Sequence, residues 1–206
     1  MTDYDLDNAY DINGPDEART LYGKWAATYD DSFGAGWGYI APREIAGIFR
    51  QLNDGNTPIL DIGAGTGLVA EHLDGLETDA LDITPEMLEV ARGKGLYRHL
   101  ITADLTQPLD LPDTTYGGVI SCGTFTHGHV GPECLPELLR VTRPGALFVC
   151  GTIAPVLDGL GFGSALARLV AAGRIEPVRF REIPIYEGAD HPHAADRGLV
   201  MAFRRI

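Results

Sequence analysis

The sequence predicts a single α/β domain in which helices cover both faces of a mostly parallel sheet. Short apolar runs alternate with helix-like segments between residues 58 and 151. The first apolar run passes through a glycine-rich turn straight into a helix-like segment. The last two apolar runs have no helix between them. A chain of 206 residues has room for one such domain and no second full one.

An N-terminal arm with a lid helix is expected over residues 1–40, and the main domain over residues 41–206. Pro15 is expected to begin the helix of the arm, because proline suits a first helical turn and two acidic residues follow it. Two interpretations of its apolar face stay open, packing on the domain or covering a ligand. The residues on that face are Leu21, Tyr22, Trp25 and Tyr29.

Beyond the arm, each element is expected where an apolar period begins and to end where glycine, asparagine or proline interrupts it. Helices are expected at 42–52, 67–73, 85–93, 132–142 and 164–172. Strands are expected at 58–62, 79–82, 100–103, 118–122, 146–151, 175–186 and 199–205. Because nothing helical separates the last two strands, they are expected to pair as antiparallel neighbours at the edge of the sheet.

The charge balance argues against two classes of partner. Twenty-nine acidic residues against sixteen basic ones leave a net charge of −13, so nucleic acid and membrane surfaces are not expected to bind. The sequence contains no run of the ~18 apolar residues that a bilayer span needs and no basic and apolar leader, so a cytoplasmic location is expected. Three cysteines without a close pair are expected to be reduced thiols.

The most informative segment is the glycine-rich turn after the first strand. Gly63, Gly65 and Gly67 allow the backbone to approach a ligand closely at the carboxyl end of the sheet, where the N–H groups of a helix point outward. Leu68 stands where the dinucleotide-binding pattern needs its last glycine. No Gly-Lys-Ser/Thr sequence follows the turn, which excludes the phosphate-binding loop of nucleoside triphosphatases. The turn therefore predicts a nucleoside-binding crevice of a different kind.

Asp82 ends the second strand, 19 residues beyond Gly63. That distance equals one helix and one strand of a βαβ unit, so the carboxylate is placed to accept two hydrogen bonds from ribose hydroxyls. The alternative is that Asp82 merely precedes a helix that Thr84 caps.

Asp104 closes the third strand, 22 residues beyond Asp82. A carboxylate there can accept a hydrogen bond from an adenine amino group, while Leu105 and Met87 enclose the ring. For Met87, an ordinary place in the hydrophobic core stays open as the alternative.

These segments together resemble class I S-adenosylmethionine-dependent methyltransferases over nearly the whole chain from about residue 20. The matching parts are residues 61–67, Asp82 with residues 84–88, the pair Ala103-Asp104, and residues 139–145. Residues 22–30 and 123–131 are more closely similar to the small methyltransferase-like family linked to the Williams-Beuren region. One departure is Ala146, where many members have a second glycine after Gly145.

The resemblance implies a Rossmann-like sheet of seven strands with an antiparallel last strand. It also implies methyl transfer from S-adenosylmethionine, with release of S-adenosylhomocysteine. The glycines would line the methionine end and the ribose, the backbone of residues 121–123 would meet the amino acid portion, and the tyrosines of the arm would close over the ligand. The implied cofactor-binding residues are Tyr22, Tyr29, Asp61, Gly63, Ala64, Gly65, Gly67, Asp82, Ile83, Met87, Asp104, Leu105, Ser121, Cys122 and Gly123.

His127 and His129 are the candidate catalytic residues. The loop after the fourth strand faces the methyl group in this fold, and an imidazole titrates near neutral pH. The alternative is that one of them only shapes the loop by binding backbone carbonyls. No third ligand for a metal is apparent nearby. His191 and His193 are expected in a solvated loop.

The leading functional hypothesis is a methyltransferase that acts on a small molecule at oxygen, nitrogen or sulfur, because no inserted domain for recognising a macromolecule is apparent. One alternative is an NAD(P)-dependent oxidoreductase on a similar sheet, and another is a module that binds S-adenosylmethionine without catalysis. The sequence does not specify the acceptor or the oligomeric state.

Overall fold

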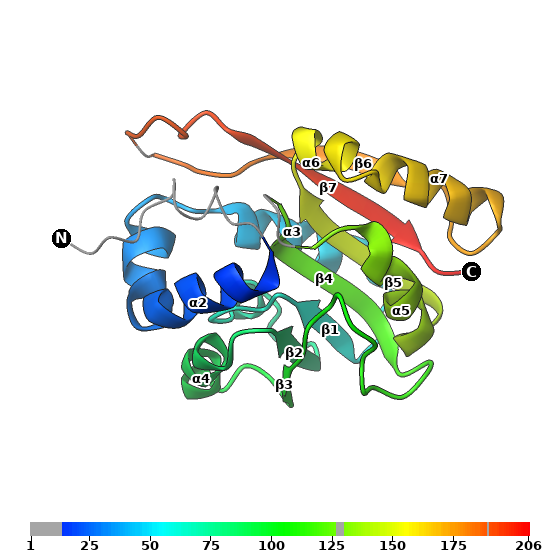
Figure 1. Ribbon diagram of the computed structural model, residues 1–206, viewed down its shortest axis with the longest axis horizontal. Coiled ribbons are helices and arrows are strands. Elements are labelled where there is room, and N and C mark those ends of the chain that lie inside the picture. The colour runs from blue at the N-terminus through cyan, green and yellow to red at the C-terminus, as the bar shows by residue number, and fades with distance from the viewer. Residues whose placement is uncertain (1–13, 127–129, 189) are drawn as a thin grey trace.

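The computed structural model describes residues 14–126, 130–188 and 190–206. Its centre is a seven-stranded sheet of order β3-β2-β1-β4-β5-β7-β6 (Figure 1). Strands β1 to β5 pair in parallel, whereas β7 is antiparallel to both β5 and β6. The expected fold class is thereby confirmed, including the antiparallel pair at the edge. The strands are β1 (Ile59–Ile62), β2 (Thr78–Asp82), β3 (Leu100–Thr102), β4 (Tyr116–Phe125), β5 (Thr142–Thr152), β6 (Arg179–Pro184) and β7 (Arg197–Arg204).

Of the six α-helices in the described ranges, five have proline in the first turn, where its missing N–H costs nothing. Within the described ranges, no helix has the length and apolar character needed to cross a bilayer. The helices are α2 (Pro15–Trp25), α3 (Ala41–Leu52), α4 (Pro85–Lys94), α5 (Leu135–Val141), α6 (Ala154–Gly159) and α7 (Phe162–Ala171).

One expected helix was wrong, and one observed helix was missed. The segment 67–73 contains turns and one 3₁₀ turn, Ala70–His72, in place of a regular helix. Gly67 itself is not helical, because its φ of +92° lies in the left-handed region, and the structure gives no further reason for the turns at 68–69. The short helix α6 was not expected, because its six residues are too few to show a helical period.

Strand lengths also differ from the expected ones. Strands β4 and β5 extend beyond 118–122 and 146–151, whereas only Arg179–Pro184 of the expected strand 175–186 belongs to β6. Pairing explains the difference, since β4 and β5 each have strands on both sides, while β6 lies at the edge of the sheet with β7 as its one partner.

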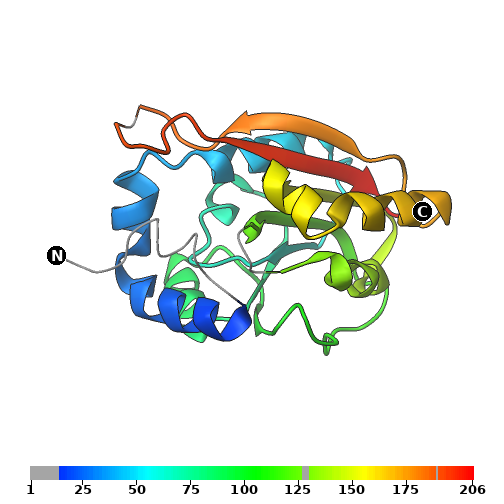
Figure 2. The same cartoon turned by 45° about the horizontal axis from the view of Figure 1, so that its top comes forward.

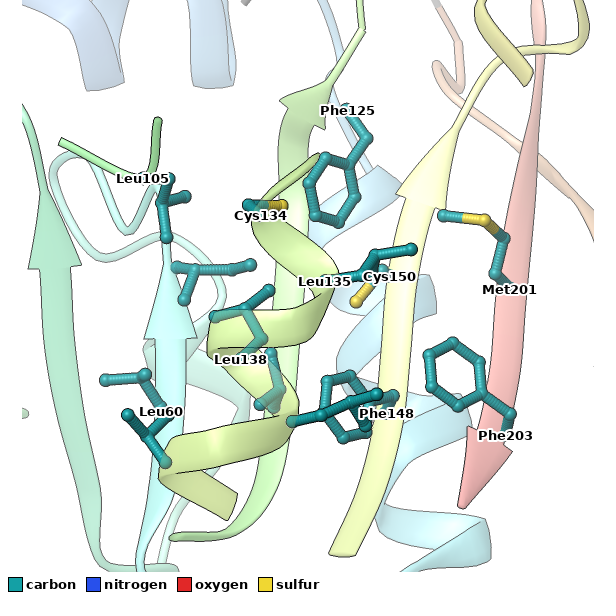
Figure 3. Packing of buried hydrophobic residues seen from close by; sticks show 14 of the residues in the cluster. Leu60, Leu105, Phe125, Cys134, Leu135, Leu138, Phe148, Cys150, Met201 and Phe203 are labelled. Atoms are coloured by element: carbon teal, nitrogen blue, oxygen red, sulfur yellow. The ribbon is translucent and has the colours of Figure 1, made fainter. Parts of the chain in front are cut away.

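Alternate residues of the central strands face two hydrophobic cores, one on each side of the sheet. Leu60 and Phe148 belong to the core that includes Leu138 of α5, and Figure 3 shows this helix lying across the strands. Ile59 belongs to the opposite core, which includes Phe49 of α3. Helices therefore cover both faces of the sheet and leave its carboxyl edge to other elements.

The arm and the hairpin that joins β6 to β7 meet beyond that edge (Figure 2). Tyr39 and Tyr186 form an isolated antiparallel bridge between them. The ring centroid of His191 lies 4.5 Å from the ring centroid of Trp37 and 4.7 Å from that of Tyr186. The expectation that His191 is simply solvated was therefore wrong, because aromatic neighbours from two segments hold it half-buried.

Candidate functional site

A pocket opens at the carboxyl ends of β1 to β4, where α2 covers it. Its volume is about 970 Å³, including the open solvent at its mouth. The residues that the strand ends contribute are Gly63, Ala64, Gly65, Asp82, Ile83, Ala103, Asp104, Leu105, Cys122, Gly123 and Thr124. Those that the arm contributes include Pro15, Ala18, Tyr22, Tyr29 and Tyr39.

The glycine-rich turn follows β1 so closely that only glycine fits at its first position. Gly63 has a φ of +61°, and a Cβ atom there would lie 2.0 Å from Thr124 Oγ1. Thr124 Oγ1 in turn donates a hydrogen bond of 2.8 Å to the carbonyl of Ile62. The turn is therefore held directly against β4, with its backbone forming one wall of the pocket.

Asp82 projects a buried carboxylate into the pocket from the end of β2. Its Oδ2 accepts a hydrogen bond of 2.8 Å from the Gly65 N–H, and its Oδ1 accepts one of 2.8 Å from the Thr84 N–H. Burial raises the pKa of Asp82, while the backbone hydrogen bonds lower it. Each carboxylate oxygen keeps a second lone pair, so the group is fixed in place and can still accept hydrogen bonds.

The geometry of Thr84 bears on one part of the alternative for Asp82. The Thr84 side chain makes no capping hydrogen bond to α4, so the expected cap was wrong. The Asp82 carboxylate instead connects the glycine-rich turn to the start of α4. Its role toward a ribose stays a prediction.

Beside Asp82, the pocket has an apolar part. Met87 and Leu105 both line it, and both are buried. Asp104 lines it as well, with Oδ1 accepting hydrogen bonds of 2.8 Å from both the N–H and the hydroxyl of Thr106. The two interpretations of Met87 thus hold together, since the same side chain is nearly inaccessible to solvent and borders the pocket.

Asp61 lies beneath the glycine-rich turn and is fully buried. Its Oδ2 accepts a hydrogen bond of 2.7 Å from the Tyr97 hydroxyl, whereas its Oδ1 has no hydrogen-bond partner among the described residues. Burial raises the pKa of Asp61 to about 7, although the bond from Tyr97 lowers it. The Tyr97 ring also packs under the turn, since a Cβ atom at Gly67 would lie 3.1 Å from its Cε2.

Replacing Asp61 with asparagine is expected to flatten the pH dependence of stability in the ligand-free protein. Between about pH 4 and pH 7, native Asp61 keeps a proton that the unfolded chain has released, so the free energy of unfolding falls as pH rises. Urea unfolding at pH 5 and pH 7.5 measures this slope in the parent and in Asp61→Asn. An unchanged slope in the variant would show that Asp61 is ionised throughout.

Ionic contacts hold the arm against the glycine-rich turn. Asp30 accepts a hydrogen bond of 2.5 Å from the Thr66 hydroxyl and forms an ion pair of 2.6 Å with Lys94 at the end of α4. Lys94 is also 2.6 Å from Glu71. The arm is therefore fastened on the side of the pocket formed by the turn.

The apolar face of the arm divides between the two roles considered for it. Trp25 is buried, with its ring 5.0 Å from that of Tyr29 and 5.7 Å from that of Phe33. Tyr22 and Tyr29 line the pocket. Trp25 thus packs into an aromatic cluster, and Tyr22 and Tyr29 belong to the same cluster while also lining the pocket.

Comparison with known proteins identifies the family. Residues 60–150 match the model of a methyltransferase domain family. The chain is 38% identical over 175 residues to methyltransferase-like protein 27 of Homo sapiens, covering 79% of this chain and 70% of that protein. The chain belongs to the class I S-adenosylmethionine-dependent methyltransferases.

Two further proteins are similar to this methyltransferase. It is 36% identical over 98 residues to the malonyl-acyl-carrier-protein O-methyltransferase of Serratia marcescens, which covers 47% of this chain and 38% of that protein. The solved structure of the CcbJ methyltransferase from Streptomyces caelestis shares the fold at 18% identity, with a TM-score of 0.64 over 89% of this chain and 97% of that one. S-adenosylmethionine is accordingly the cofactor of the family and of this enzyme.

Most residues expected to bind the cofactor surround the pocket of this methyltransferase, and three do not. Asp61 lies beneath the turn, Gly67 belongs to the turn without lining the pocket, and Ser121 is fully buried, with Oγ 2.9 Å from the carbonyl of Ile62. Ser121 points toward β1, so its side chain is unable to meet a ligand. The expected residues that line the pocket are Tyr22, Tyr29, Gly63, Ala64, Gly65, Asp82, Ile83, Met87, Asp104, Leu105, Cys122 and Gly123. The candidate catalytic residues His127 and His129 lie outside the described residues.

Sequence reasoning missed three residues of this site. Tyr97 supports Asp61 from the loop after α4, Thr124 contacts the glycine-rich turn, and Tyr39 lines the pocket with its hydroxyl 3.1 Å from Cys122 Sγ. Tyr39 and Tyr97 belong to no motif, whereas Thr124 lies in the resembling segment 123–131, and each reaches the site through tertiary packing. The sequence distance between Tyr39 and the motifs of the main domain gave no signal for its contact, since spacing alone does not predict one.

The described residues fit S-adenosylmethionine on two observations. Asp82 offers fixed carboxylate oxygens with lone pairs left for hydroxyl groups, beside the apolar surface of Met87 and Leu105. The pocket therefore has both the hydrogen-bond acceptors and the apolar wall that such a nucleoside needs.

Proposed function

We propose that this methyltransferase acts on a small-molecule acceptor by a single direct displacement. When bound, S-adenosylmethionine supplies a methyl group already activated by its sulfonium charge. The protein then has to align the acceptor behind that methyl group and exclude water. The observation that supports a small acceptor is the roof that Ala18, Tyr22 and Tyr29 form over the pocket, because a roofed pocket suits an enclosed molecule better than an extended macromolecule.

In this proposal, different pocket residues bind different parts of the cofactor. Asp82 accepts hydrogen bonds from the ribose hydroxyls, and Asp104 accepts one from the adenine amino group between Met87 and Leu105. The turn at Gly63–Gly65 and the backbone of Cys122 and Gly123 border the methionine end, and Tyr22 and Tyr29 close over it. The positions of these residues around one pocket support the assignment.

Direct displacement requires no nucleophile from the enzyme, and the chemistry of Cys122 agrees with that. Burial raises the pKa of the Cys122 thiol to about 12, so the thiol stays protonated at neutral pH. A protonated thiol is a poor nucleophile, which leaves the acceptor itself to attack the methyl carbon.

His127 and His129 stay the proposed base or acceptor-contacting residues. Replacing either one with alanine is expected to lower kcat while leaving the affinity for S-adenosylhomocysteine unchanged, because both follow the strand that ends beside the methionine portion. Calorimetric titration and initial rates with an identified acceptor measure the two effects. If both variants keep the parent kcat, neither histidine is a base.

The relatives leave the acceptor open. The Serratia protein is by its name an O-methyltransferase of malonyl-acyl-carrier protein, whereas the name of the human relative gives no acceptor. Fold does not choose among oxygen, nitrogen and sulfur acceptors.

The experiment that tests the proposal incubates the protein with S-adenosylmethionine labelled in its methyl group and with an extract of the source cells. The products are then separated into small-molecule, protein and nucleic acid fractions, with excess S-adenosylhomocysteine as the blocking control. We expect blockable label in the small-molecule fraction. Label confined to protein or nucleic acid would contradict the small acceptor, and binding of the cofactor without any transfer would favour a non-catalytic module.

A further inference from the structure

A second cavity adjoins the cofactor pocket. Its volume is about 710 Å³, including the open solvent at its mouth. Both cavities are lined by Tyr22, Tyr29, Tyr39, Cys122 and Gly123. The two cavities therefore meet at the carboxyl end of β4, and a molecule in the second would face a ligand in the first.

The walls of the second cavity are of two kinds. On one side, Phe33 and Tyr39 have ring centroids 4.7 Å apart, and that of Tyr186 lies 5.9 Å from Tyr39. On the other side, the ends of β5, β6 and β7 bring Ile153, Ile183 and Leu199. Aromatic faces opposite aliphatic side chains form a surface suited to a flat apolar molecule.

No formal charge borders this cavity within the described part of the chain, since the residues that line it there include no Asp, Glu, Lys, Arg or His. Two of the polar groups that line it are engaged inside the protein. The Tyr39 hydroxyl is 3.1 Å from Cys122 Sγ, and Thr152 donates a hydrogen bond of 2.9 Å to the Phe125 carbonyl. Burial raises the pKa of both Tyr39 and Cys122, so both remain uncharged at neutral pH.

We infer that the second cavity is the acceptor pocket and that it takes an uncharged aromatic molecule. This inference rests on the proposed function. A charged ligand would lose its hydration in the cavity without gaining a counter-ion from the described walls. Tyrosine faces attract an ammonium ion, but this attraction offsets only part of the hydration free energy that the ion loses on entering the cavity.

The charge preference is tested with three probes that share an indole ring. These are 3-methylindole, which is neutral, tryptamine, which is cationic, and indole-3-acetate, which is anionic. Each is titrated calorimetrically into the protein with and without saturating S-adenosylhomocysteine. The inference predicts that 3-methylindole binds at least about 10-fold more tightly than either charged probe. Equal or tighter binding of a charged probe, or no binding of 3-methylindole at millimolar concentration, would overturn it.

A matched pair of variants locates the probe. Leu199 lines the second cavity and not the first, and it is partly exposed in β7. Leu199→Asp and Leu199→Asn differ only in charge, and both are expected to bind S-adenosylhomocysteine as the parent does. Relative to Leu199→Asn, the aspartate should raise the affinity for tryptamine over that for 3-methylindole by about 10-fold or more. An unchanged preference would place the probes elsewhere, whereas a parent that fails to bind S-adenosylhomocysteine would instead refute the proposed function.

Discussion

Replacing Asp82 with alanine will weaken the binding of S-adenosylhomocysteine by at least about 100-fold. In the proposed site, two ribose hydroxyls donate to its carboxylate, and hydrogen bonds to a charged group are worth about 1.5–3 kcal/mol each. The loss of two such bonds corresponds to a decrease in affinity of about 100-fold or more. The variant also leaves the Gly65 and Thr84 N–H groups without their acceptor. Isothermal titration calorimetry measures the loss directly.

Asp82→Asn provides the matched control for charge. Asparagine keeps the shape of the side chain and one acceptor oxygen, so its affinity should lie between those of the parent and the alanine variant. Circular dichroism and urea unfolding of each ligand-free variant show whether the fold is retained. A folded Asp82→Ala protein that binds within about threefold of the parent would refute the ribose assignment.

Gly63→Ala should lower the free energy of unfolding by about 2–5 kcal/mol and abolish cofactor binding in whatever protein remains folded. A φ of +61° costs a non-glycine residue about 1–2 kcal/mol. The added methyl group would also lie 2.0 Å from Thr124 Oγ1, and such overpacking costs roughly 1–3 kcal/mol more. The turn would have to move away from β4, which displaces the wall of the pocket.

Gly65→Ala separates the two costs. Gly65 has a similar φ of +54°, but nothing lies within 4 Å of an added Cβ atom. Its expected loss is therefore the backbone strain alone, about 1–2 kcal/mol. Urea unfolding of both variants measures the difference. Equal losses in the free energy of unfolding would mean that the close contact with Thr124 adds nothing to the cost of Gly63→Ala.

The fold was largely predictable because its signals are local and repeat along the chain. Apolar runs of strand length alternate with helical periods, and the absence of a helix before β7 predicted the antiparallel pair. The boundaries were less predictable. The strands β4 and β5 are extended by pairing on both sides, and turns with one 3₁₀ turn stand where a helix was expected at 67–73.

The pocket was predictable where its residues sit at strand ends. The carboxyl ends of parallel strands meet at one edge, so Asp82 and Asp104 were expected near the glycine-rich turn. Tyr39, Tyr97 and Thr124 were not found, because each depends on how distant segments pack. The backbone of Ser121 was expected at the ligand, which stays a prediction, while its hydroxyl bonds to the neighbouring strand, an orientation that sequence spacing does not reveal.

The central claim is that the nucleoside lies across the ends of β1, β2 and β3 and is held by Asp82. A crystal structure of the protein with S-adenosylhomocysteine tests it most directly. We predict both ribose hydroxyls within about 3.2 Å of the Asp82 carboxylate oxygens, and the adenine between Met87 and Leu105. A nucleoside bound elsewhere, or an Asp82 side chain turned away from the ribose, would contradict it.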